Sequence, residues 1–293
     1  MKRHAPKPPK AYKDMEFLNS PDARLVRMIS EFLEPQRRFR QARIKDTIVM
    51  FGSARIRPRQ ETLATLRSVE AVLRKSPKPT KHLLTSLRDA EIQVEMSRYY
   101  EDAVELSRLI TSWAKKFDSP RRFVICSGGG PGIMEAANRG ASLAKGESIG
   151  LNISLPFEQY ANDYVSDGLS FEFHYFFMRK FWFVYLAKSL VIFPGGFGTL
   201  DELMEVLTLL QTNKVKKPVA VVMYGEEYWK KVIDFDELVA HGMITREDLR
   251  LFRFMETPDE AFHYLKEFLT KTYLTKEGPS GVRRSANGDV QVT

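Results

Sequence analysis

Residues 190–202 have the sequence Leu190-Val191-Ile192-Phe193-Pro194-Gly195-Gly196-Phe197-Gly198-Thr199-Leu200-Asp201-Glu202. The first four residues predict a buried strand, and Pro194 with the three glycines ends it before a helix that begins near Thr199 and runs to Gln211. Glycines lack a Cβ, so this backbone can approach a ligand closely, and the unpaired amides of the first helical turn point toward it. The stretch therefore predicts a phosphate-binding turn, and the carboxylates of Asp201 and Glu202 suggest chemistry beside the phosphate.

Two similar turns are expected upstream. Residues 47–51 predict a buried strand that ends at Gly52-Ser53-Ala54-Arg55, and residues 123–126 predict another that ends at Gly128-Gly129-Gly130-Pro131-Gly132. The carboxyl ends of the strands form the edge where ligands bind in an open α/β sheet. A nucleotide or a sugar phosphate is therefore the expected ligand.

Strands and helices alternate along the core. Further strands are expected at 149–155, 169–173 and 218–223, and helices at 99–117, 133–143, 175–188, 228–239 and 257–269. This order predicts an α/β protein with a doubly wound, mainly parallel sheet and helices on both faces. Residues 57–98 interrupt it with charged helical sequence, which we interpret as an insertion. The predicted organisation is an extension at 1–45, a core domain at 46–273 and a disordered tail at 274–293.

The N-terminal extension carries most of the net charge of +8. Residues 1–45 contain twelve Lys and Arg against five Asp and Glu, a net charge of +7. Residues 1–13 are expected to be disordered and 21–43 to form an amphipathic helix. Nucleic acid could bind such a segment, but without interleaved aromatic residues a solvated or oligomer-contacting extension is the favoured interpretation.

Composition narrows the class of protein. The 293 residues include no apolar run close to the ~20 residues that span a bilayer, and the N-terminus has no apolar signal region. The single cysteine, Cys126, cannot form an intrachain disulfide and is expected to be a buried strand residue without a catalytic role. A cytoplasmic protein with no membrane partner is expected. The five histidines lack the spacing of metal ligands, so neither a metal nor a cofactor is implied.

Two common nucleotide-binding classes are disfavoured. The turn at residues 128–132 does not fit the G-x-G-x-x-G pattern, because Ile133 stands where the third glycine is required. The pattern G-x-x-x-x-G-K-[ST] is absent from the sequence. A nicotinamide-dependent dehydrogenase and a P-loop kinase or ATPase are therefore not expected.

The string from Pro194 to Glu202 resembles the PGGxGTxxE motif of the LOG (LONELY GUY) family. The turns at 52–55 and 128–135 and the pair Arg179-Lys180 are similar to that family too, and together they extend over roughly residues 46–270 in the expected order. The resemblance, closest to longer bacterial members, implies a modified Rossmann fold, usually a homodimer, and hydrolysis of nucleoside 5′-monophosphates to free base and ribose 5-phosphate. Members are often labelled lysine decarboxylases, an activity for which this sequence offers no physical support.

The resemblance also implies roles for individual residues. Arg179 and Glu202 are the expected catalytic pair, with Glu202 holding the ribose or orienting water and Arg179 acting electrostatically. The amides of residues 195–199 and the Thr199 hydroxyl are expected to bind the 5′-phosphate. The turn at Gly128, Gly129 and Gly130 is expected to close over the nucleotide. The other expected binding residues are Ser53, Arg55, Glu135, Met178, Lys180, Gly195, Gly196, Gly198 and Asp201.

Several alternatives remain open at this stage. The base is undetermined, because the extension and the insertion depart from compact members. AMP, a cytokinin riboside monophosphate or another purine or pyrimidine monophosphate would fit. A different class of protein on the same scaffold, binding a nucleotide or molybdenum cofactor without catalysis, is the main competitor. The retained pair of Arg179 and Glu202 favours the enzyme, as a homodimer or a higher homo-oligomer.

Overall fold

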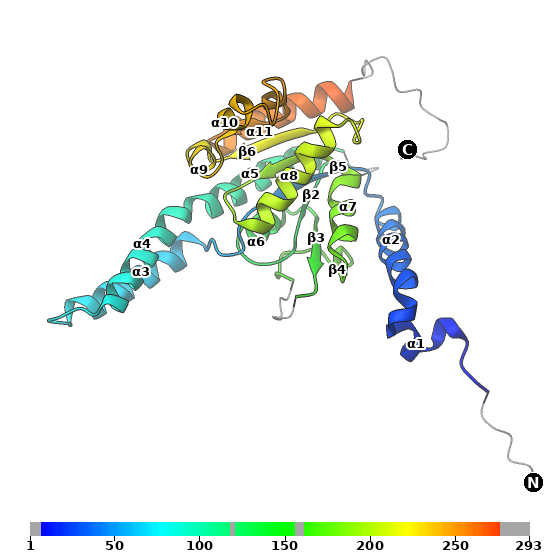
Figure 1. The fold of residues 1–293 in the computed structure, drawn as a ribbon, viewed down its shortest axis with the longest axis horizontal. Coiled ribbons are helices and arrows are strands. Elements are labelled where there is room, and N and C mark those ends of the chain that lie inside the picture. The colour runs from blue at the N-terminus through cyan, green and yellow to red at the C-terminus, as the bar shows by residue number, and fades with distance from the viewer. Residues whose placement is uncertain (1–6, 118–120, 156–160, 276–293) are drawn as a thin grey trace, which may run out of the picture.

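A seven-stranded parallel sheet forms the centre of the computed structural model, which describes residues 7–117, 121–155 and 161–275 (Figure 1). The strand order is β4-β3-β2-β1-β5-β6-β7. The sequence-based prediction of an α/β fold with a doubly wound sheet is confirmed. The strands are β1 (Thr47–Phe51), β2 (Val124–Ser127), β3 (Ser148–Ile153), β4 (Ser170–Phe173), β5 (Ala187–Ile192), β6 (Ala220–Tyr224) and β7 (Arg253–Met255).

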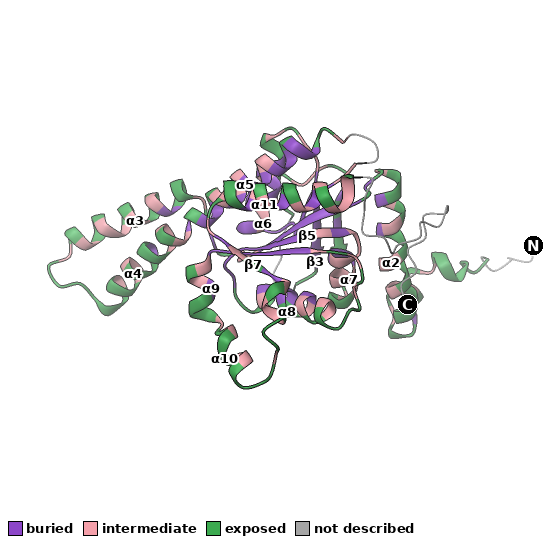
Figure 2. Cartoon of the chain, turned by 90° about the horizontal axis from the view of Figure 1, so that it is seen from above, coloured by how far each residue is buried: buried purple, intermediate pink, exposed green. Residues whose placement is uncertain are grey.

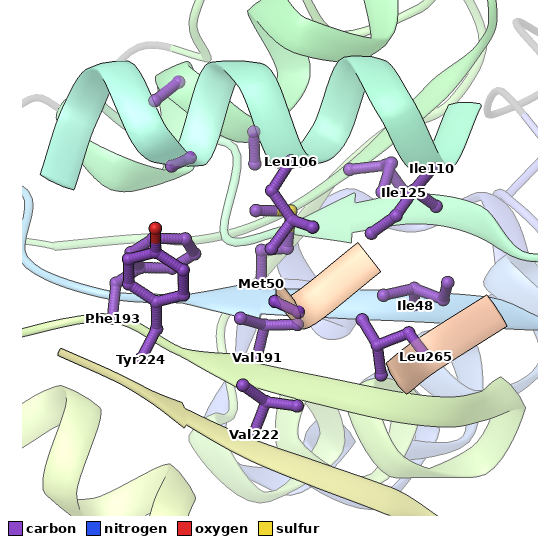
Figure 3. Close-up of a cluster of buried hydrophobic side chains, with 14 of the residues drawn as sticks. Ile48, Met50, Leu106, Ile110, Ile125, Val191, Phe193, Val222, Tyr224 and Leu265 are labelled. Carbon is purple, nitrogen blue, oxygen red and sulfur yellow. The ribbon is translucent and has the colours of Figure 1, made fainter. Parts of the chain in front are cut away.

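Helices cover both faces of the sheet (Figure 2). One face packs against α5 (Arg98–Ala114), α6 (Ile133–Leu143) and α11 (Pro258–Leu269), and the other against α7 (Phe176–Leu186), α8 (Phe197–Gln211) and α9 (Glu226–Val232). Alternate residues of β1 serve the two cores, since Ile48 and Met50 belong to the first and Val49 and Phe51 to the second. Figure 3 shows Ile48 and Met50 beneath the apolar face of α5. Every residue of β1 is buried, as in a central strand covered on both sides.

The N-terminal extension is largely helical where it is described. Short 3-10 turns at Ala11–Lys13 and Pro21–Ala23 flank α1 (Met15–Asn19), and α2 (Arg24–Gln41) follows. The Glu31 carboxylate accepts the backbone N–H groups of His174 and Tyr175, at 2.8 and 3.2 Å. The Arg38 guanidinium donates to the carbonyl oxygens of Gly168 and Ser170. These contacts attach α2 to the edge of the sheet at β4 and α7.

Residues 57–98 form a helical hairpin that projects from the body (Figure 1). Its helices are α3 (Arg59–Arg74) and α4 (Lys81–Met96). Thr80 caps the second helix by accepting the N–H of Leu83, at 3.2 Å. The predicted helical character of the insertion is confirmed. No helix among the described residues is long and apolar enough to cross a membrane.

Two predicted helices had wrong boundaries, and one strand was not predicted. The helix predicted at 175–188 ends at Leu186, because Ala187 turns extended and pairs with Thr47 to begin β5. The helix predicted at 228–239 is divided into α9 and α10 (Phe235–Ala240), since Ile233 is extended and Asp234 caps the second helix. The edge strand β7 was missed, because three residues are too few to give a pattern.

Two short turns complete the described C-terminal part of the chain. A 3-10 turn at Asp248–Leu251 precedes β7, and a π-helical turn at Thr270–Leu274 follows α11. The predicted tail falls, apart from its first two residues, outside the described residues. Of the N-terminal residues expected to be disordered, 11–13 form a 3-10 turn, and 1–6 also lie outside the described residues.

Gly132 joins the second glycine turn to the first. Its backbone has φ +71°, and a Cβ at this position would overlap the backbone oxygen of Ser53. That same oxygen accepts the N–H of Ile133 at 3.1 Å. The close approach therefore requires glycine for both backbone conformation and space.

We expect Gly132→Ala to lower the free energy of unfolding by more than about 2 kcal/mol, since it adds a backbone clash to the strain of a positive φ. Gly242→Ala is the matched control, because Gly242 has the same φ of +71° and open space around its Cα atom. That control is expected to lose about 1 kcal/mol. Urea unfolding measures both, and equal losses would contradict the close approach of the two turns.

Candidate functional site

The site lies where β1 and β5 leave the sheet. Sheet order runs from β1 through β2 in one direction and from β5 through β6 in the other, so this is the point where the topology switches. The Ser53 N–H donates to the Pro194 carbonyl oxygen at 3.0 Å, which holds the two turns together. A cavity of about 830 Å³ opens at this edge. Its size lies within the usual range for small-molecule sites.

The first turn of α8 presents unpaired amides to the cavity. Gly196 precedes the helix without a side-chain cap, and the first helical bond is from the N–H of Leu200 to the carbonyl of Gly196. The N–H groups of Phe197, Gly198 and Thr199 therefore have no acceptor within the described part of the chain. Space around the Cα atoms of Gly196 and Gly198 is open, whereas the Thr199 side chain fills the space at Gly195. This turn is suited to receive an anionic group.

Glu202 is a buried carboxylate on the same helix. Thr199 and Glu202 are three residues apart, so they share the inward face of α8, with exposed fractions of 7% and 5%. The Glu202 Oε1 atom lies 3.7 Å from Arg179 Nη2 on α7. Burial raises the pKa of Glu202 to about 7, and the nearby charges of Arg179 and Lys180 lower it by less. Desolvation therefore outweighs the long ion pair at this carboxylate.

The positive charge of Arg179 is only partly balanced by Glu202. Burial lowers the pKa of its guanidinium, an effect that the charge of Glu202 opposes. Its Nε atom is shielded from solvent and has no hydrogen-bond partner among the described residues. The rings of Phe176 and Phe183 lie 5.3 and 5.5 Å from its Cζ atom. A guanidinium held with an unused donor beside a cavity can bind or stabilise negative charge there.

Nine of the expected site residues line this cavity. They are Ser53, Arg55, Gly128, Arg179, Gly195, Gly196, Gly198, Thr199 and Glu202. These residues come from three turns and from α7 and α8, and the fold brings them to one edge.

Lys180 and Asp201 lie outside the cavity and pair with each other. Lys180 Nζ is 2.7 Å from Asp201 Oδ1 and 2.9 Å from Glu205 Oε2. Asp201 precedes Glu202 by one residue, so the helical twist points it to the exposed side of α8. The structure therefore places this pair beside the cavity and not in its lining, and a contact of the pair with the ligand stays a prediction.

Gly129, Gly130, Glu135 and Met178 also lie outside the cavity lining. Asn162 Nδ2 donates to the carbonyl oxygens of Gly129 and Gly130, both at 3.0 Å, which holds this turn against the loop before β4. Glu135 accepts the hydroxyl of Tyr100 at 2.6 Å, and Met178 packs against the core. Only Gly128 of the second glycine turn reaches the cavity, because the turn is tied back by Asn162.

Sequence reasoning missed several lining residues. Tyr228 on α9 donates its hydroxyl to the Gly195 carbonyl oxygen at 2.8 Å and so braces the glycine turn before α8. Gln93 and Met96 reach the cavity from the end of α4. Tyr228 is the first residue of the predicted helix, a position that carries no spacing signal, and the sequence of the insertion does not show where it packs.

Cys126 is buried in β2, where burial raises the pKa of its thiol. The described residues contain no group of three or more His, Cys, Asp or Glu side chains arranged to hold a metal ion.

Comparison with known proteins shows which family the chain resembles. A family profile described as "Possible lysine decarboxylase" matches residues 134–265, which include Arg179 and Glu202. Over these residues the chain is similar to that family, and the curated relatives that it matches are LOG proteins. The cytokinin riboside 5′-monophosphate phosphoribohydrolase LOG of Oryza sativa subsp. japonica is 32% identical over 91 residues, 31% of this chain and 38% of that protein. A cytokinin riboside 5′-monophosphate phosphoribohydrolase of Arabidopsis thaliana is 31% identical over 82 residues, 28% of this chain and 38% of that protein.

The match to these LOG relatives spans about two fifths of their length. Solved structures with a similar chain include the molybdenum cofactor carrier protein of Chlamydomonas reinhardtii, at 19% identity and a TM-score of 0.42, covering 78% of this chain and 99% of that one. The molybdenum cofactor binding protein of Rippkaea orientalis has 22% identity and a TM-score of 0.41, covering 59% and 88%.

The raised pKa of Glu202 predicts how the stability of the protein depends on pH. Its value of about 7 in the folded protein lies above the ordinary value of 4.5, so ionisation opposes folding increasingly as the pH rises through this window. We expect the stability of Glu202→Gln relative to the wild type to increase by about 2 kcal/mol from pH 5 to pH 8. Chemical unfolding at both pH values measures this difference. Asp201→Asn, at the exposed neighbour, is expected to show no such increase.

Proposed function

We propose that this chain hydrolyses the N-glycosidic bond of a nucleoside 5′-monophosphate, such as AMP or a cytokinin riboside monophosphate, to free base and ribose 5-phosphate. The observation that carries the proposal is the position of the buried Glu202, 3.7 Å from Arg179 and one helical turn from the open N-terminus of α8. The activity for which the LOG relatives are named supports the same reaction.

In this proposal the phosphate of the substrate binds at the first turn of α8. The amides of Phe197, Gly198 and Thr199 donate to its oxygens, and the positive end of the helix dipole favours its charge. Arg55 lines the same cavity and adds a cation. Tyr228 keeps the turn in place through the Gly195 carbonyl oxygen. Binding at this end fixes the ribose over the inward face of α8.

Glu202 then acts on the anomeric carbon. Breaking the bond from C1′ to the base nitrogen leaves positive charge on the ribose, and its electron pair departs with the base. An ionised Glu202 stabilises that charge and accepts a proton from the water that attacks C1′. A carboxylate whose pKa is about 7 is well matched to accept a proton at neutral pH.

Arg179 contributes charge and position. Its guanidinium stays protonated, so it serves as an electrostatic group and not as a proton donor. In the desolvated site this charge is stronger than it would be in water. It holds Glu202 in place and stabilises the negative charge that develops on the leaving base. The proposal includes a homodimer, as the resemblance implies, and a cytoplasmic location, as the single cysteine suggests.

The direct test is release of ribose 5-phosphate from AMP, CMP, GMP, UMP and a cytokinin riboside monophosphate. We expect turnover of at least one nucleotide and a loss of kcat of about 10²- to 10³-fold in Glu202→Gln, because the transition-state charge loses its partner. Asp201→Asn removes the adjacent exposed carboxylate and is expected to retain wild-type kcat. Absence of turnover with every nucleotide, together with a nucleotide-dependent rise in melting temperature, would favour the non-catalytic binding protein.

The pH profile provides a separate test. Because the ionised form of Glu202 is the active one, kcat/KM is expected to fall about tenfold per pH unit below an apparent pKa of about 7. The residual activity of Glu202→Gln is expected to lack this step. A wild-type profile that is flat from pH 5 to pH 8 would be inconsistent with proton acceptance by this carboxylate.

A further inference from the structure

The projecting hairpin contributes to the wall of the active cavity. Ile56 precedes α3, and Gln93 and Met96 belong to the last turns of α4, and all three line the cavity. Gln93 and Met96 are three residues apart and therefore share one face of the helix. The insertion thus supplies a polar side chain and an apolar side chain to the site that holds Glu202.

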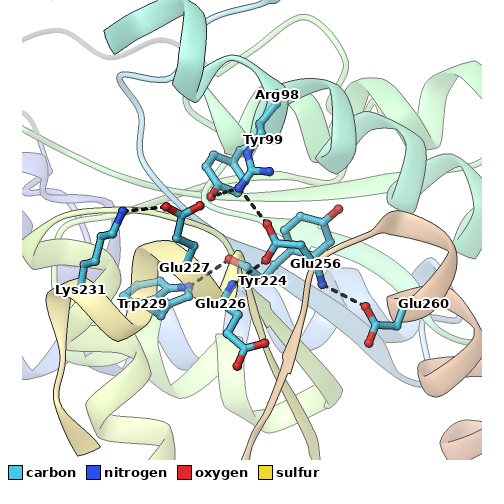
Figure 4. A network of polar contacts seen from close by, with 9 residues as sticks. All are labelled: Arg98, Tyr99, Tyr224, Glu226, Glu227, Trp229, Lys231, Glu256 and Glu260. Carbon is cyan, nitrogen blue, oxygen red and sulfur yellow. Dashed lines mark hydrogen bonds and ion pairs between the residues drawn. The ribbon is translucent and has the colours of Figure 1, made fainter.

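The end of α4 is firmly attached to the body. The N–H of Ser97 bonds to the Gln93 carbonyl oxygen at 3.0 Å, and Ser97 Oγ donates to the Val94 carbonyl oxygen at 2.6 Å. Arg98 follows and bonds to Glu256 at 2.8 Å beside the ring of Tyr99 (Figure 4). Glu256 in turn accepts the N–H of Glu226 at the start of α9. These contacts fix the helix turn that carries Gln93 relative to the sheet edge.

The carboxamide of Gln93 is not satisfied by the protein. Its Oε1 atom is shielded from solvent and has no hydrogen-bond partner among the described residues. An unpaired buried acceptor is destabilising, by an amount comparable to a lost hydrogen bond. Rotation about the last side-chain torsion of glutamine is soft, so the group can turn toward an occupant of the cavity. A ligand with a donor at this wall would therefore satisfy the carboxamide oxygen.

We propose that Gln93 recognises the base of the nucleotide, an inference that rests on the function proposed above. Its carboxamide oxygen accepts from an exocyclic amino group, and its NH₂ group donates to the adjacent unprotonated ring nitrogen. Adenine presents this pair at its N6 amino group and N7 atom. Hypoxanthine presents two acceptors at the same edge, O6 and N7, and therefore leaves the carboxamide oxygen without a donor whichever way the carboxamide turns. Met96, on the same helix face, adds an apolar contact to the base.

The inference is tested by binding, which does not require turnover. Dissociation constants for AMP and IMP are measured by calorimetry in the Glu202→Gln background, with and without Gln93→Ala. We expect AMP to bind at least about tenfold more tightly than IMP, and Gln93→Ala to reduce this ratio to about twofold or less. Gln60→Ala is the matched control, since Gln60 is an exposed glutamine on α3 outside the cavity lining; it is expected to leave the ratio unchanged.

The possible failures are distinct. An AMP preference that persists in Gln93→Ala, no preference in the parent, or no binding of either nucleotide overturns the role of Gln93. Failure of the proposed reaction has another signature, because the wild type would then bind AMP without releasing ribose 5-phosphate. Loss of the preference in Gln93→Ala would support base recognition in either case.

Discussion

The pairing of β1 with β5 is the constraint on which the site depends. These strands are far apart in sequence, yet Val49 lies opposite Leu190 and Phe51 opposite Ile192 at the centre of the sheet. The chain turns away from them in opposite directions, which leaves space at their carboxyl ends. The bond from Ser53 N–H to the Pro194 carbonyl oxygen and the approach of Gly132 to Ser53 set the distance between the three turns. The cavity is thus a consequence of strand order and of glycines at crowded positions.

The same packing determines the state of the candidate catalytic pair. Because α7 and α8 both cover one face of the sheet, Arg179 and Glu202 are removed from water together. Their 3.7 Å separation is too long for a strong hydrogen-bonded ion pair, so desolvation dominates both groups. The fold thereby retains two poorly satisfied charges beside an open helix N-terminus. In the proposed reaction the negative charge on the leaving base is the partner of Arg179, and the positive charge that develops on the ribose is the partner of Glu202.

The sequence was sufficient for six of the seven strands, the glycine turns and the edge at which the candidate site forms, because buried strands and strand-to-helix turns have strong local patterns. It did not distinguish the directions of two neighbouring side chains on one helix. Asp201 and Glu202 are neighbours, but only Glu202 shares the face of Thr199, Leu203 and Val206. Helical spacing alone could have separated them. The contributions of Gln93 and Tyr228 could not be predicted in this way, because both depend on how distant helices pack at the sheet edge.

The most direct test of the account is a crystal structure with ribose 5-phosphate, the proposed product. The account predicts the phosphate on the amides of Phe197, Gly198 and Thr199, with the anomeric carbon facing the Glu202 carboxylate. A phosphate bound elsewhere, or a ribose that turns its anomeric carbon away from Glu202, would contradict the assignment of this site to glycosidic bond hydrolysis.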